Sequence, residues 1–135
     1  MMIPFEFTIP GPPVSLQTKN RTRLQQWKQE VRAAATARVP AGAELTDAEV
    51  QVTITYYYEG DTPDVDNIIK PIQDALVGVV FVDDEQVHQT KSWKRALNGS
   101  YQIKGASGVL LQAFAAGSQF LHIRVEACPH VGVLD

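Results

Sequence analysis

The feature that most constrains the fold is an alternating segment at residues 48–60, AEVQVTITYYYEG. Hydrophobic and aromatic residues recur at every second position there, which is the side-chain period of an extended strand. One side carries Val50, Val52, Ile54, Tyr56 and Tyr58, and the other carries Gln51, Thr53, Thr55, Tyr57 and Glu59. The pattern predicts a strand with one buried face and one face in water.

The remaining elements predicted from the sequence make an α+β domain with a mixed sheet and two main helices. A first helix is expected from a capping box at Thr22 and Gln25 to a stop at Pro40, and a second over 66–77, ending at Gly78. Residues 98–119, rich in Gly and Ser around a short helical pattern, receive no assignment. Further strands are predicted at 3–9, 79–82, 87–97 and 120–127.

The composition is that of one small globular domain, covering residues 1–135, in which 44% of residues are hydrophobic. The longest apolar run, 75–82, is too short to span a bilayer, and no signal peptide is evident at the start. The single cysteine, Cys128, excludes an internal disulfide and a thiolate metal site, and we expect it to be buried. A cytoplasmic protein with no membrane partner is expected.

Charge is distributed unevenly along the chain although the net charge is only −3. Residues 1–40 carry a net charge of +4, residues 41–90 carry −10, and residues 91–135 carry +3. This distribution suits the binding of a polyanion. The basic segments would bind the polyanion on both sides, while a metal ion neutralises the acidic centre. Ordinary surface charge that happens to cluster is an equally good explanation from composition alone.

The acids are densest in the segment 62–87, TPDVDNIIKPIQDALVGVVFVDDEQV. Asp64 and Asp66 lie two residues apart and can aim at one point, while helical spacing places Lys70 and Asp74 on the same stripe as Asp66. The predicted strand 79–82 then delivers Asp83 and Asp84 at its end. Carboxylates without cysteine or a histidine pair suit Mg²⁺ or Mn²⁺, and a nearby lysine suits metal-assisted phosphodiester hydrolysis.

Each acid also has a purely structural explanation. Asp66 is a possible N-cap, Asp74 a possible i+4 partner of Lys70, and DDEQ a possible solvated turn. Pro71 would lie five residues inside the predicted helix and kink its start. The combination of all these acids in one short segment nevertheless favours a functional site.

The run DVDNIIKPIQDALVGVVFVDDEQV at 64–87 resembles the signature of RusA-type Holliday junction resolvases: Asp-x-Asp-Asn, then Lys, Asp-Ala-Leu, and an apolar segment ending in Asp-Asp-x-Gln. The resemblance implies that Asp64, Asp66 and Asp84 bind Mg²⁺, or Mn²⁺ in its place, and that Lys70 is the catalytic lysine. It gives Asn67 and Asp74 supporting positions, with Asp83 as a weaker metal-ligand candidate.

The same resemblance implies an endodeoxyribonuclease of bacterial or prophage origin that acts in DNA recombination and repair. The implied enzyme is a homodimer with two active sites, which nicks a four-way DNA junction in pairs and leaves 5′-phosphates. Residues 12–23 match the basic start of the family, and their implied DNA contacts are Lys19, Asn20, Arg21 and Arg23.

A second set of DNA contacts is predicted from the strand at 87–97. Lys91, Trp93 and Arg95 fall on one strand face and could hold a phosphate and stack a base. An exposed lysine and arginine beside a packed tryptophan is the alternative, slightly favoured, interpretation.

Two other functions stay open at this point. One is a general Mg²⁺-dependent nuclease, which would cut linear or flapped DNA as well as junctions. The other is a DNA-binding protein that has kept the fold without turnover, although intact Asp64, Asp66, Lys70 and Asp84 argue against it.

Overall fold

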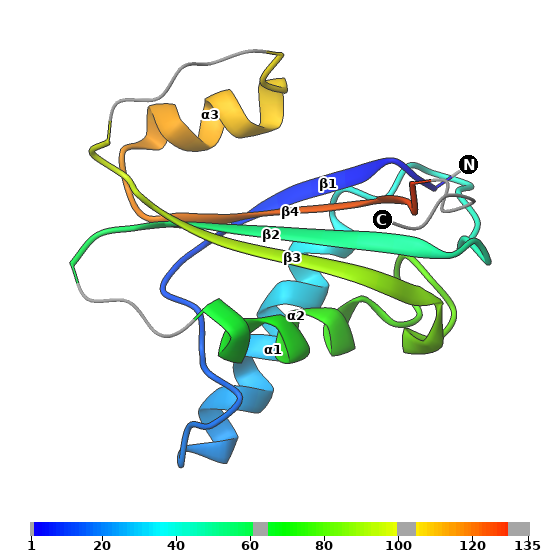
Figure 1. The fold of residues 1–135 in the computed structure, drawn as a ribbon, viewed down its shortest axis with the longest axis horizontal. Coiled ribbons are helices and arrows are strands. Elements are labelled where there is room, and N and C mark those ends of the chain that lie inside the picture. The colour runs from blue at the N-terminus through cyan, green and yellow to red at the C-terminus, as the bar shows by residue number, and fades with distance from the viewer. Residues whose placement is uncertain (1, 61–64, 100–104, 130–135) are drawn as a thin grey trace, which may run out of the picture.

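The computed structural model describes residues 2–60, 65–99 and 105–129, and these form a mixed sheet with helices on both sides (Figure 1). This confirms the predicted α+β class and mixed sheet. The elements in chain order are β1 (Phe5–Pro10), α1 (Arg21–Thr36), β2 (Val50–Tyr58), the 3₁₀ turn η1 (Val65–Ile68), α2 (Ile69–Leu76), the 3₁₀ turn η2 (Asp84–Gln86), β3 (Val87–Ala96), α3 (Gly108–Ala116) and β4 (Phe120–Ala127).

The four strands lie in the order β1-β4-β2-β3. β4 is antiparallel to both β1 and β2, whereas β2 and β3 run parallel, with Thr53 opposite Lys91 and Thr55 opposite Trp93. The parallel pair requires a crossover connection, and η1, α2 and η2 supply it. The acidic segment of the sequence therefore lies in the crossover between β2 and β3.

β2 is an interior strand, and its two faces differ from the prediction in one respect. Val50, Val52 and Ile54 are fully buried against α1 and α2, as the alternation predicts. The opposite face was expected to be wet, yet Gln51 and Thr55 on it are also buried. A strand with neighbours on both edges is shielded by their side chains, which the pattern of one strand does not reveal.

α1 packs its apolar stripe against the sheet and α2, and Trp27 on this stripe is buried in the core. The predicted capping box at Thr22 is wrong. The N-cap is Asn20, whose side-chain Oδ1 accepts a hydrogen bond from the Arg23 N–H at 3.0 Å. Both residues can cap a helix, and Asn20 is two residues nearer the loop that precedes it.

A third α-helix, α3, lies on the face of the sheet opposite α1 and α2, where only two main helices were predicted (Figure 1). Ser107 caps its N-terminus by accepting from the Leu110 N–H, and Gly117 ends it with a φ of 77°. The Ser107 hydroxyl also donates to Glu6 on β1 at 3.0 Å, and His122 on β4 contacts the same carboxylate at 2.6 Å. These contacts hold α3 to the sheet.

The predicted strand at 79–82 is wrong, although three of its four residues are buried. Gly78 adopts a φ of 81°, its N–H donates to the Phe81 carbonyl at 2.8 Å, and the chain folds back on itself. Phe81 makes only isolated bridges, to Thr46 and Val77. A short apolar run is equally compatible with a buried turn, and periodicity does not separate the two.

One smaller prediction, on the cysteine, is corrected by the structure. Cys128 is only half-buried, so the expectation that it is a core residue is wrong. Among the described residues, no helix is long and apolar enough to cross a membrane.

Candidate active site

The centre of the acidic segment is an ion-pair cluster formed by Lys70, Asp74 and Asp84. The Lys70 Nζ lies 2.7 Å from the Asp74 Oδ1 and 3.2 Å from the Asp84 Oδ2. Asp74 also faces the Nζ of Lys28, on α1, at 3.5 Å. The structure therefore brings together three residues that the sequence singled out, two from α2 and one from η2.

The electrostatics of this cluster keep Lys70 positively charged. The hydrogen bond with Asp74 and then that with Asp84 raise the pKa of Lys70 above its ordinary value. A hydrogen bond with the Asp83 side chain, followed by the hydrogen bond and charge of Lys70, lowers the pKa of Asp84. At neutral pH the cluster thus holds an ammonium group between carboxylates, with 47% of the lysine side chain exposed to solvent.

The start of α2 places Lys70 at the surface and also anchors the loop that precedes α1. Pro71 is the third residue of α2, in the first turn, rather than five residues inside a helix, so no hydrogen bond within α2 is lost at this proline. Its ring nitrogen carries no hydrogen and cannot donate to the carbonyl four residues earlier, on Asn67. That carbonyl instead accepts from the Leu16 N–H at 2.9 Å, which holds the 11–20 loop beside η1.

η1 is also fixed to β3, because the Ser92 hydroxyl donates to the Val65 carbonyl at 2.8 Å. Asp66 lies in this turn and is exposed. The structure thus places Asp66 on a segment held by β3 on one side and by the 11–20 loop on the other.

Asp83 and Asp84 lie in a capped turn rather than at the end of a strand. Asp83 is the N-cap of η2, and its carboxylate accepts from the Glu85 N–H at 3.1 Å. The Gln86 side chain completes a capping box by accepting from the Asp83 N–H at 3.0 Å. The capped turn contains both an ordinary structural acid, Asp83, and an acid that faces Lys70, Asp84.

Two residues of this region were missed by the sequence analysis as parts of the site. Gln86 was noted only as a letter of the Asp-Asp-x-Gln signature, although a Gln three residues after an Asp is itself a capping-box pattern. No sequence pattern indicates that Lys28 belongs to the site, because its contact with Asp74 depends on how α1 packs against α2.

The predicted metal ligands are only partly described. Asp64 lies outside the described residues, so its position relative to Asp66 and Asp84 stays a prediction. Among the residues that the structure does describe, no three His, Cys, Asp or Glu side chains form a group able to hold a metal ion. The donor chemistry nevertheless fits a hard divalent cation, since Asp66 and Asp84 offer carboxylate oxygens at the surface.

The predicted DNA contacts near the start of α1 have structural partners of their own. Asn20 caps α1, Arg21 donates from Nη1 to the Leu16 carbonyl at 3.0 Å, and Arg23 pairs with Glu30 at 3.1 Å. Lys19, in the same loop, is exposed. These side chains stay at the surface, next to the loop that Asn67 anchors.

The predicted contacts on β3 share one face of an edge strand. The register with β2 places Lys91, Trp93 and Arg95 on the face opposite α1 and α2. Trp93 is 49% exposed and its ring centroid lies 5.2 Å from the Arg95 guanidinium carbon. The alternative of a packed tryptophan is therefore wrong, and the pair forms an exposed cation–π contact.

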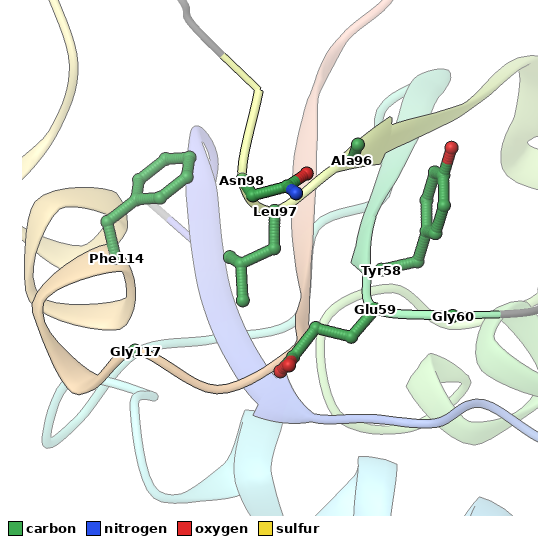
Figure 2. Close-up of a pocket in the computed structure, with 8 residues that line it drawn as sticks. All are labelled: Tyr58, Glu59, Gly60, Ala96, Leu97, Asn98, Phe114 and Gly117. Atoms are coloured by element: carbon green, nitrogen blue, oxygen red, sulfur yellow. The ribbon is translucent and has the colours of Figure 1, made fainter.

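A separate pocket of about 540 Å³ opens where β2 and β3 end beside α3, as Figure 2 shows. Its described lining is largely apolar, with Tyr58, Leu97 and Phe114, and Glu59 is the one charged side chain among the described lining residues. Because the described lining residues include no cation, they offer little to bind a phosphate. The pocket consequently adds nothing to the cluster around Lys70.

The fold and the site define a small mixed α+β domain that carries a lysine–carboxylate cluster in the crossover between parallel strands. The family model described as Endodeoxyribonuclease RusA matches residues 14–100, more than half of the chain. The protein belongs to this family of DNA-cleaving hydrolases, which confirms the resemblance found in the sequence. No curated protein matches the chain.

Proposed function

We propose that this protein is a structure-specific endodeoxyribonuclease that resolves four-way DNA junctions by paired nicks, in recombination and repair. The observation that carries the proposal is the cluster in which the Lys70 ammonium lies 2.7 Å from Asp74 and 3.2 Å from Asp84. All three residues lie inside the region that matches the family model. An exposed ammonium held by carboxylates suits the recognition of a backbone phosphate.

Mg²⁺, or Mn²⁺ in its place, is the proposed cofactor, held by Asp64, Asp66 and Asp84. Bound there, the cation would make a water molecule more acidic and offset negative charge at the scissile phosphate. Carboxylate oxygens are the hard ligands that this ion prefers. The side chain of Asp84 is half-exposed, so a bound cation there would stay accessible to a DNA phosphate.

Lys70 has two roles that its contacts support. In the described structure its ammonium neutralises Asp84, and in the working enzyme it would donate a hydrogen bond to a non-bridging oxygen of the scissile phosphate. Asp74 keeps the ammonium in place through the shorter contact when Asp84 turns to the metal. This division assigns Asp74 to positioning and Lys70 to contact with the substrate.

DNA would approach from two basic surfaces. The first is the start of α1 with its preceding loop, where Lys19, Arg21 and Arg23 lie at the surface beside the anchored Leu16. The second is the open face of β3, where Lys91 can meet a phosphate and Trp93 can stack on a base.

A homodimer is proposed because the reaction needs two active sites. A four-way junction presents two symmetry-related scissile phosphates, and one chain carries a single Lys70 cluster. A twofold dimer would place one cluster at each phosphate. Sedimentation at cleavage concentrations tests this directly: a dimer mass is expected, and a monomer that still makes paired nicks would contradict it.

The substrate is tested with a labelled synthetic four-way junction, a flap and a linear duplex of the same sequence, each incubated with Mg²⁺. The proposal predicts symmetric nicks with 5′-phosphate ends on the junction and at least tenfold slower cutting of the other DNAs. Equal cutting of all three would replace the proposal with a general nuclease. Tight junction binding without cutting would leave a binding protein.

A further inference from the structure

The side chain of Gln86 makes four hydrogen bonds, although nothing so far assigns it a role in the reaction. Its Oε1 accepts from the N–H groups of Val82 and Asp83, at 2.8 and 3.0 Å. Its Nε2 donates to the carbonyls of Thr46 and Ala48, both at 2.9 Å. A side-chain amide has two donors and one acceptor oxygen with two lone pairs, and here every one of them is used.

The two backbone segments that Gln86 joins have few other links. Residues 82–84 follow a folded-back turn rather than a strand, so no sheet ladder fixes them. The segment 46–48 precedes β2 and is linked to the turn by the Thr46 N–H, which donates to the Val80 carbonyl at 2.9 Å. Gln86 therefore fixes the end of the turn to the start of the central strand.

What the amide fixes is the backbone that carries Asp84. Two of its hydrogen bonds are made to the two residues immediately before Asp84, and Asp84 begins the turn that Gln86 ends. The Asp84 carboxylate reaches Lys70 across 14 residues of chain. The location of Asp84 relative to α2 thus depends on a turn that Asp83 caps from within and that the Gln86 side chain links to Thr46 and Ala48.

We propose that Gln86 is a second positioning residue of the active site, which places Asp84 relative to Lys70 and the cation, as Asp74 places Lys70. This inference rests on the proposed function, in which Asp84 is a metal ligand. Glutamine is specific for the task because it accepts on one side and donates on the other. Glutamate can keep the two bonds from Val82 and Asp83 but has no hydrogen to give to Thr46 and Ala48.

The test compares Gln86→Leu and Gln86→Glu with the matched control Gln112→Leu, since Gln112 is an exposed glutamine on α3, away from both proposed DNA-binding surfaces. Single-turnover cleavage of a bound four-way junction is measured over a range of Mg²⁺ concentrations, with junction affinity measured in parallel. Gln86→Leu is expected to lower the rate, or raise the Mg²⁺ concentration for half-maximal rate, by about 10–100-fold. Junction affinity should stay within about threefold, and Gln112→Leu should behave as the wild type.

Amide hydrogen exchange in the absence of metal gives an independent readout. Gln86→Leu should speed the exchange of the Val82 and Asp83 amides while that of Ile54, in the core, stays unchanged. In Gln86→Glu, the Val82 and Asp83 amides should exchange as slowly as in the wild type, while the Mg²⁺ concentration for half-maximal rate should still rise. This variant therefore tests the positioning role of Gln86 even if Gln86→Leu does not fold.

Wild-type rate and Mg²⁺ dependence in Gln86→Leu would overturn the inference while leaving the proposed function intact. Faster exchange throughout the core, in step with the loss of cleavage, would also overturn it by making Gln86 a general structural residue. Failure of the wild type to cut any junction would instead contradict the proposed function, and amide exchange would still test the link between Gln86 and the turn.

Discussion

Replacing Lys70 by methionine separates catalysis from stability most sharply. The change removes the charge and keeps a chain of similar length at a position where 47% of the side chain is exposed. The i,i+4 ion pair with Asp74 is of a kind that contributes about 0.3–0.5 kcal/mol. A loss of this size leaves a domain of ordinary stability, about 5–15 kcal/mol, folded.

The expected effect on cleavage is far larger. Removing one preorganised donor to the developing charge lowers the rate by about 10²–10³-fold, equivalent to about 2.7–4 kcal/mol of activation free energy. Junction binding should weaken by no more than about fivefold, since Lys70 is one phosphate contact among several. Single-turnover cleavage, gel-shift binding and urea unfolding measure the three quantities.

Lys28→Met is the matched control, because it removes the other ion pair of Asp74, at 3.5 Å, from α1. It should change the cleavage rate by less than about fivefold, as a surface pair of this kind contributes at most about 1 kcal/mol. Equal losses of cleavage in the two variants, or a loss of binding in Lys70→Met that matches the loss of rate, would refute a role for Lys70 in the chemical step.

Asp84→Asn should abolish cleavage while junction affinity is retained or increased, because an acid near the phosphate is removed; a parallel loss of affinity in a gel-shift titration would point to a structural role instead. Lys91→Ala should weaken binding at all sequences and reduce the slope of log K against log salt by about 1, with an unchanged slope counting against a phosphate contact. The prediction for Glu6 concerns how the stability of the fold changes with pH. Burial alone would raise its pKa, but hydrogen bonds from His122 and Ser107 outweigh burial and lower the pKa below 4.5. Its stabilising contribution is therefore complete above about pH 4.5 and is lost as the pH falls through the lower folded-state pKa. Urea midpoints should accordingly fall less between pH 7 and pH 3 in Glu6→Gln than in the wild type, and identical falls would contradict the assignment.

The strands and the buried side of the sheet were predictable because their signals are local. The alternation in 48–60 and the apolar positions of 120–127 depend on neighbours two residues apart, and both segments form strands. The helix start at Asn20 was missed because two candidate caps compete within two residues, and their choice depends on the preceding loop.

The sequence was enough to predict which residues make up the site, but only some of the contacts between them. Spacing along a helix indicates that Lys70 meets Asp74, and the structure gives this contact as the shorter of the two. The approach of Asp84 depends on the chain folding back after Gly78, where a strand was predicted over 79–82, and on the hydrogen bonds of Gln86 to Thr46 and Ala48. Contacts across 38 and 40 residues of chain leave no local pattern.

The central claim is that Lys70 and the carboxylates of Asp66 and Asp84, in the crossover between β2 and β3, form the catalytic centre. Its most direct test is a preformed complex with a labelled four-way junction, assembled without metal and started by adding Mg²⁺, with wild type beside Asp66→Asn. The account predicts Mg²⁺-triggered symmetric nicks by the wild type, and an intact complex that makes no nicks in the variant. Cleavage by Asp66→Asn at the wild-type rate, or cleavage by the wild type before Mg²⁺ is added, would contradict it.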